Sequence, residues 1–193
     1  MSMICNLRRA SRDDITRLLA APTQITAFLY GVEAPIPGTL SLLWSLIRRT
    51  PPATPAAVVQ PPRMDGDEVD LDKAWHGLHF LFTGTAWEGD EPACFLVRGG
   101  EAIGSVDVGY GPARALAPDR VRRFAEFLEA LSPDELDRRY DPARMTALDI
   151  YPGNWTGTGE PEEMDVLLEG FAMLRDFVTE TREAGDALVV YLN

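Results

Sequence analysis

The 193-residue sequence has little of what marks secreted, membrane-spanning or disulfide-bonded proteins. It contains two cysteines, Cys5 and Cys94, and each lies in an apolar stretch that suits a small buried side chain better than a disulfide framework. The longest apolar run, Leu40 to Ile47, is far too short to span a bilayer. The first residues, MSMICNLRRAS, lack the charged-then-apolar order of a signal peptide. We therefore expect a cytoplasmic protein with reduced thiols and no membrane partner.

Positive charge is also scarce. Asp and Glu number 30 against 18 for Lys and Arg, which gives a formal net charge of −12. The densest basic cluster, Arg120, Arg122 and Arg123, is interleaved with acidic residues. A surface of this charge repels phosphate backbones, so we expect no nucleic-acid partner. The same charge favours solubility and suits a basic protein partner.

Signatures of cofactor and metal sites are missing as well. In GYGPAR, Arg114 stands where the third glycine of a dinucleotide-binding fingerprint belongs, and the Lys-Ser/Thr pair of a phosphate-binding loop is absent. The two histidines, His76 and His79, are three residues apart, whereas a zincin helix places them four apart with a glutamate between them. No Gly-x-Ser-x-Gly nucleophile motif occurs. We expect neither a cofactor nor a metal.

The composition is that of a folded globular protein, with 46% hydrophobic and 25% charged residues. We assign residues 1–193 to a single domain, with a proline-rich and acidic loop at 50–70. The segment Pro92–Arg98 fits a short helix or a strand equally well. Periodicity and capping signals predict helices that begin near Ser11, Gln24, Leu40, Asp70, Pro118, Ser132, Asp141 and Glu162, and strands at Met3–Leu7 and Ala187–Leu192. This pattern predicts an α+β fold: a mainly helical domain with a small sheet that includes the N- and C-terminal strands.

The stretch LDKAWHGLHFLFTGT, Leu71 to Thr85, predicts a buried helix. Apolar residues and His79 recur at steps of three and four along one stripe, whereas His76 is rotated off that stripe. Asp70 is the expected N-cap, and Gly84 is the expected left-handed residue past the end. A buried His79 needs a hydrogen-bond partner, because an unpaired polar group in the core costs roughly 1–3 kcal/mol. We interpret His79 as a hydrogen-bonded core histidine, with a functional pocket histidine as the alternative.

Several motifs together resemble the bacterial YfbM-like family, a domain family of unknown function. The matching motifs cover nearly the whole chain: MSMI, LDKAWHGLHFLFTG, GGEAIG, DVGYGPAR, the helix at Pro118, ALDIYPGNW, and the long terminal helix with its last strand. The resemblance implies a single α+β domain in the bacterial cytosol, and it implies no activity and no catalytic set. The motif positions that it marks are Trp75, His76, His79, Gly109, Tyr110, Gly111, Pro112, Arg114, Tyr151 and Pro152.

Two of these motifs predict sharp turns beside polar side chains. The glycines of GYGPAR form one turn, which leads into an extended segment, and Tyr151 to Gly153 form the other, with Trp155 packed over it. We expect Arg114 either to pair with a carboxylate or a helix end, or to bind an anion together with the turn amides. Asp149 is the carboxylate of the apolar ALDIYPGNW motif, and we expect it to pair with Arg114 or His79, or to act as a cap.

We place the candidate site among the polar and aromatic residues of these motifs, which are Trp75, His76, His79, Tyr110, Arg114, Asp149, Tyr151 and Trp155. We favour a binding or protein-interaction domain. One alternative is a small enzyme whose pocket is made of His79, Tyr110, Arg114 and Asp149. The other is an acidic inhibitor or immunity-type protein that neutralises a basic partner. The enzyme requires its four side chains to converge on one concave surface.

Overall fold

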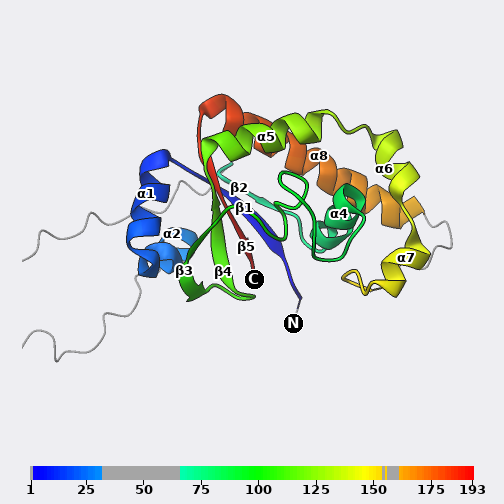
Figure 1. The fold of residues 1–193 in the computed structure, drawn as a ribbon, viewed down its shortest axis with the longest axis horizontal. Coiled ribbons are helices and arrows are strands. Elements are labelled where there is room, and N and C mark those ends of the chain that lie inside the picture. Colours follow the sequence, from blue (N-terminus) through cyan, green and yellow to red (C-terminus); the bar gives the residue numbers. More distant parts are fainter. Residues whose placement is uncertain (1, 32–65, 154, 156–160) are drawn as a thin grey trace, which may run out of the picture.

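A computed structural model describes residues 2–31, 66–153, 155 and 161–193. Its frame is a five-stranded antiparallel sheet in the order β2-β1-β5-β4-β3 (Figure 1). The strands are β1 (Cys5–Ala10), β2 (Glu68–Asp70), β3 (Glu101–Asp107), β4 (Pro112–Leu116) and β5 (Ala187–Leu192). The helices are α1 (Arg12–Ala20), the 3-10 turn η1 (Pro22–Gln24), α2 (Ile25–Tyr30), α4 (Ala74–Thr83), α5 (Pro118–Glu129), α6 (Pro133–Arg139), α7 (Pro142–Ala147) and α8 (Pro161–Ala184).

The strands near the two ends of the chain, β1 and β5, lie side by side inside the sheet. Leu7 of β1 and Val190 of β5 belong to the larger core, which packs against α4, α5 and α8. Ala10 and Val189 face the opposite way, into a smaller core beneath α1 and α2. Figure 1 shows these two helix groups on opposite sides of the sheet. Because both faces of β5 are covered, its sequence is apolar throughout. The predicted α+β domain with both terminal strands in its sheet is confirmed.

Helix α4 begins at Ala74 rather than directly after Asp70. Asp70 is the last residue of the edge strand β2, so its backbone pairs with β1. The prediction that Asp70 is the N-cap is therefore wrong, and its carboxylate instead accepts a hydrogen bond from the amide of Asp72 at 2.6 Å. Strand β2 also falls inside the loop predicted at 50–70 and shortens it. The end of the helix is as predicted, since Gly84 is left-handed with φ 71°.

Every residue of α4 from Ala74 to Phe82 is buried. The prediction of a single apolar stripe is therefore wrong, because His76 lies off that stripe and is fully buried all the same. Helix α8 and Trp155 pack closely on α4 at Gly77, because a Cβ at this position would stand 2.6 Å from Cδ2 of Leu167 and 2.9 Å from Cη2 of Trp155. The sequence LDKAWHGLHFLFTGT thus forms the central buried helix of the larger core.

Local signals elsewhere have mixed outcomes. The predicted caps at Ser11, Ser132 and Asp141 are confirmed, because each side chain accepts a hydrogen bond from the backbone amide three residues later. Pro92–Arg98 forms consecutive turns, so neither predicted alternative, helix or strand, is correct there. The helix predicted to begin at Leu40 lies outside the described residues.

Candidate functional site

His76 joins two loops that flank α4. Its Nε2 donates a hydrogen bond to the carbonyl of Ala86 at 2.7 Å, and its Nδ1 accepts one from the amide of Tyr151 at 2.9 Å. A carbonyl only accepts and an amide only donates, so the ring is held as the neutral tautomer with its proton on Nε2. Burial lowers the pKa of His76 and so acts in the same direction. Both ring nitrogens are used, and His76 is a structural link between the loops.

His79 lies one turn further along α4 and is fully buried, as predicted. Its Nε2 forms a hydrogen bond of 3.4 Å with Oγ1 of Thr83, and its Nδ1 has no hydrogen-bond partner among the described residues. The partner that the prediction requires is therefore present at one of the two ring nitrogens. Burial lowers the pKa of His79 to about 4, and the neighbouring His76 ring acts in the same direction. The imidazole is accordingly neutral near pH 7.

Aromatic rings surround His76. Trp75 stacks on the imidazole with 4.7 Å between ring centroids, and Trp87 lies 4.4 Å from it with the planes tilted by 42°. Tyr151 stacks on Trp75 at 6.1 Å. Four of the predicted site residues, Trp75, His76, His79 and Tyr151, therefore meet in one cluster. Their contacts are those of packing, and the cluster connects α4 to the loops on either side of it.

Arg114 lies on β4 and directs its guanidinium at the turns of residues 92–99. It donates hydrogen bonds to the carbonyls of Phe95 at 3.1 Å, Leu96 at 2.9 Å and Gly99 at 3.1 Å. Within the described ranges no carboxylate pairs with Arg114, so the predicted ion pair is wrong. The charge of Arg114 holds an irregular segment in place by satisfying carbonyls that no strand partner satisfies.

The GYGPAR turn, which joins β3 to β4, is filled by an aspartate of the same hairpin. The carboxylate of Asp107 accepts hydrogen bonds from the amides of Gly109 at 2.8 Å and Gly111 at 3.0 Å. The amides that an anion-binding corner requires are thus already occupied, and Arg114 points elsewhere. Tyr110, at the tip of the turn, is exposed, and its amide donates to the carbonyl of Leu192.

Asp149 is exposed and adopts a left-handed backbone with φ 52°. No hydrogen bond or ion pair joins it to Arg114 or His79 in the part of the chain that the structure describes. The same holds for every pair within the set His79, Tyr110, Arg114 and Asp149, and none of the four lines the groove described next. The predicted enzyme pocket therefore gains no support from these residues.

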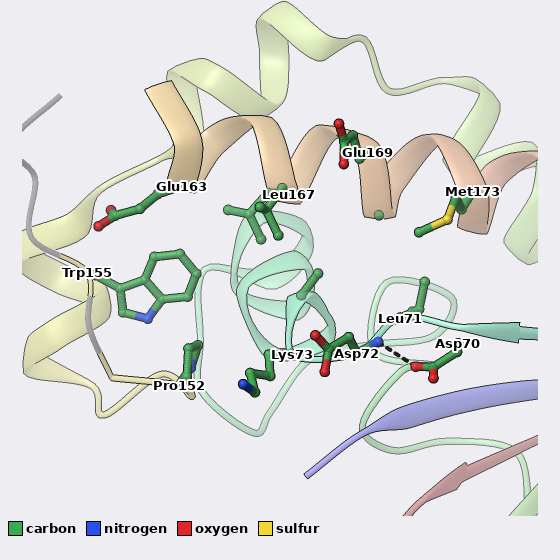
Figure 2. A pocket seen from close by; sticks show the side chains of 13 residues that line it. Asp70, Leu71, Asp72, Lys73, Pro152, Trp155, Glu163, Leu167, Glu169 and Met173 are labelled. Atoms are coloured by element: carbon green, nitrogen blue, oxygen red, sulfur yellow. Dashed lines mark hydrogen bonds between the residues drawn. The ribbon is translucent and has the colours of Figure 1, made fainter. Parts of the chain in front are cut away.

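A groove with a volume of about 380 Å³ lies between α8 and the segment that leads into α4 (Figure 2). We call it the α4–α8 groove. Val166 and Met173 of α8 are exposed at its margin, at 55% and 49%. Ligand-binding sites commonly have volumes of roughly 300–1,000 Å³, so the size suits an occupant. Its apolar lining consists of Leu71, Ala74, Pro152, Trp155, Val166, Leu167, Gly170 and Met173.

Charged side chains border this apolar surface, and most of them are acidic. Among the described residues that line the groove, four carboxylates stand against the single ammonium group of Lys73. In Figure 2, Asp72 and Lys73 lie along the wall opposite α8, and Glu169 lies on α8. The α4–α8 groove thus combines apolar surface with net negative charge. The four acidic residues are Asp70, Asp72, Glu163 and Glu169.

Trp155 stands at one end of the groove with Glu163 and Pro152 (Figure 2). Its Nε1 donates to the carbonyl of Ile150 at 2.7 Å, and its ring meets Tyr140 edge-on at 6.3 Å. The hydroxyl of Tyr140 donates to Oε2 of Glu163 at 2.5 Å. Of the predicted site residues, Trp155 is the one that lines the groove.

Sequence reasoning missed the α8 side of the groove. Val166, Gly170 and Met173 recur at steps of four and three, beside the core stripe that contains Leu167. This second row makes the apolar face of α8 wider than burial against the core requires. That width was the available signal, because an ordinary surface helix carries one apolar stripe.

Two general findings limit the chemistry of the described residues. Across residues 2–31, 66–153, 155 and 161–193, no group of three or more His, Cys, Asp or Glu side chains is placed to hold a metal ion. Over the same ranges, no helix has the length and apolar character needed to cross a membrane.

Comparisons with known proteins identify the family. The model of a family described as Domain of unknown function (DUF1877) matches residues 1–191. A solved structure, a protein of unknown function YfbM from Escherichia coli, matches with a TM-score of 0.67 and 18% sequence identity, over 98% of this chain and 99% of that chain. No curated protein matches. At that identity the structural likeness shows the fold alone. The chain belongs to the DUF1877 family, and the resemblance to the YfbM-like family is confirmed.

Proposed function

We propose that this member of the DUF1877 family is a protein-binding domain whose α4–α8 groove takes an apolar, positively charged segment of a partner protein. The observation that carries the proposal is the combination, among the described lining residues, of an apolar surface with four carboxylates and one ammonium group. An apolar side chain in the groove removes surface such as that of Val166 and Met173 from water, at about 25 cal/mol per Å² buried.

The charge of the groove selects among occupants. Glu169 is exposed on α8 and has no ion pair among the described residues, so it is available to a basic group. A basic partner is also attracted at long range by the formal net charge of −12, which steers association and weakens with salt. An acidic or nucleic-acid segment meets repulsion from both sources.

The form of the groove favours a segment of protein over an enclosed small ligand. It follows α8 from Glu163 to Met173, ten residues or about 15 Å of helix. Exposed apolar residues line its margin rather than a closed interior, as in sites where a peptide lies along a helix. We place this binding in the cytoplasm, because Cys5 and Cys94 are both free and buried as thiols.

A charge-reversal pair tests the proposal. Short peptides that combine Leu or Met with Arg are titrated by fluorescence polarisation against the wild-type protein, Glu169→Lys and the control Asp137→Lys. Asp137 is an exposed acidic residue of α6 and lies outside the groove. Both variants replace an acidic residue by lysine and therefore change the net charge equally. We expect Glu169→Lys to weaken binding about tenfold and Asp137→Lys to leave it nearly unchanged, with the difference shrinking at high salt.

Three results would overturn the proposal. The first is that no apolar-basic peptide binds. The second is that both variants bind equally well, which would place the peptides outside the groove. The third is concentration-dependent self-association that Val166→Glu abolishes, because the groove would then be an interface between copies of this chain.

The inhibitor or immunity-type hypothesis uses the same surface with a larger basic partner. It predicts affinity dominated by charge, so binding falls steeply with ionic strength. A peptide whose affinity depends mainly on its Leu or Met and little on salt favours the interaction domain instead.

A further inference from the structure

The geometry points to a division of the α4–α8 groove into two subsites: an arginine side chain of the partner lies against Trp155 and Glu163, and an apolar side chain lies between Leu71, Gly170 and Met173. This inference rests on the proposed function and specifies which side chains of the partner the groove binds.

The Trp155 end is built to hold a flat ring in place. The indole is fixed by the hydrogen bond from Nε1 to the carbonyl of Ile150 and by the edge-on contact with Tyr140. Its outer ring atoms lie over Gly77, where a Cβ would stand 2.9 Å from Cη2. Trp155 is 9% exposed and lines the groove, so this rigid indole can contact an occupant without losing side-chain freedom on binding.

A carboxylate stands beside that ring. Glu163 lines the same end of the groove, and the hydroxyl of Tyr140 donates to its Oε2. Burial raises the pKa of Tyr140, and the neighbouring Glu163 carboxylate raises it further, which fits a phenol that keeps its proton and donates it. Tyr140 thus holds the Glu163 carboxylate at the Trp155 end of the groove.

An aromatic face beside a carboxylate suits arginine better than the other cations of proteins. A guanidinium is planar and weakly hydrated, so it stacks on an indole while its edge donates to a carboxylate. A methylated ammonium is normally enclosed by several rings, whereas Trp155 is the aromatic residue that lines this groove. An acidic or neutral side chain gains neither contact.

The opposite end of the groove is apolar. Leu71 and Met173 face each other across it, and Figure 2 shows the Met173 side chain directed into the groove. Gly170 lines this end as well and packs closely on α4, because a Cβ at this position would stand 3.0 Å from the Ala74 Cβ. A flexible thioether adapts to differently shaped apolar side chains, so this end selects apolar character more than one residue type.

The length of α8 between the two subsites sets the spacing of the partner residues. Glu163 and Met173 are ten residues apart, which corresponds to about 15 Å along the helix axis. An extended segment advances about 3.3 Å per residue, so about four to five residues separate the arginine from the apolar residue. A peptide with the two residues adjacent reaches only one subsite.

The test compares peptides that each differ from one parent peptide in a single respect, which is charge, apolar surface or spacing. A peptide with arginine and leucine four residues apart is compared with versions that carry citrulline for arginine, alanine for leucine, or the two residues adjacent. Citrulline has the shape of arginine without its charge. Each peptide is titrated against the wild-type protein, Glu163→Gln, and Asp137→Asn as the matched neutralisation outside the groove.

We expect wild-type protein to bind the arginine peptide about tenfold more tightly than the citrulline peptide. Glu163→Gln brings this ratio close to one, and Asp137→Asn leaves it unchanged. The ratio is measured within each variant, so a general loss of stability does not mimic the effect. The adjacent-residue peptide binds more weakly than the spaced one.

The location of binding is read independently at Lys73, the only lysine of the sequence and a residue of the groove. Reductive methylation with labelled formaldehyde keeps its charge and gives an NMR signal that shifts when the groove is filled. If the Lys73 signal shifts but the arginine preference is absent, or survives Glu163→Gln, the subsite assignment is wrong while the proposed function stands. If the signal does not shift with any peptide, the proposed function fails as well.

Discussion

The buried histidines make the free energy of unfolding depend on pH in a defined window. The pKa of His79 is about 4 in the folded chain against an ordinary value of 6.5, so the folded state binds fewer protons than the unfolded state between these values. The contribution of His79 is fully present above pH 6.5 and is lost as the pH falls toward 4. One pKa unit corresponds to about 1.36 kcal/mol, so about 2 kcal/mol is lost between pH 7 and pH 5. The lowered pKa of His76 adds to the loss in the same direction.

The carboxylate of Glu91 does not obscure this window. Against the opposing effect of burial, the amide of Gly100 and the guanidinium of Arg123 lower the pKa of Glu91 below its ordinary 4.5. The stability that this carboxylate contributes is therefore retained at pH 5 and lost only at lower pH. The interval from pH 7 to pH 5 belongs mainly to the two histidines.

Urea unfolding at several pH values between 5 and 7 measures the effect, with His79→Gln as the comparison. We expect wild-type protein to lose about 2 kcal/mol or more over this interval and His79→Gln to lose less, whatever its absolute stability. NMR gives a second measurement, because two histidines give two ring Cε1–H signals to follow. An unchanged pH dependence in His79→Gln, or a His79 signal that titrates near pH 6.5, would refute the reasoning.

Two further substitutions test the packing that positions the groove. Gly77→Ala should lower the free energy of unfolding by about 1–3 kcal/mol in urea, because the new Cβ would overlap Leu167 and the ring of Trp155. A neutral result would mean that α4 and α8 are further apart than described. Arg114→Leu should lower the free energy of unfolding by about 2–4 kcal/mol, because it removes the donor for three carbonyls of residues 95–99. Proteolysis should become faster and should begin in that segment. Cleavage elsewhere or unchanged stability would contradict the role assigned to Arg114.

The fold was predictable to the extent that its signals are local. The cap at Ser132, the left-handed end at Gly84 and the apolar run of β5 each depend on residues close in sequence, and each is confirmed. Errors arose where distant segments compete for the same residue. Local sequence predicts Asp70 as an N-cap, but its backbone pairs with β1 instead. The helical pattern places His76 off the core stripe, but a second layer covers α4 and buries it.

The candidate site was less predictable than the fold. Arg114 and Asp149 were predicted as site residues because charged side chains are common in functional sites. Arg114 instead donates hydrogen bonds to backbone carbonyls, and Asp149 is exposed. The groove was missed because its α8 residues are ordinary apolar and acidic ones. Val166 and Met173 form a groove only together with the segment at Leu71, which lies across from them. No spacing rule connects residues so far apart in the chain.

The sequence by itself determined the class of protein, most of the helices and the inclusion of both end strands in the sheet of an α+β fold, and its motifs identified the family by resemblance. The class, the helices and the strands follow from composition, from periodicities of two and 3.6 residues, and from caps that act over a few residues. Only the tertiary structure decided the neutral tautomer of His76 and the existence of the α4–α8 groove. The hydrogen bond between His76 and Tyr151 spans 75 residues of chain, and such partners are chosen by the packing of whole layers.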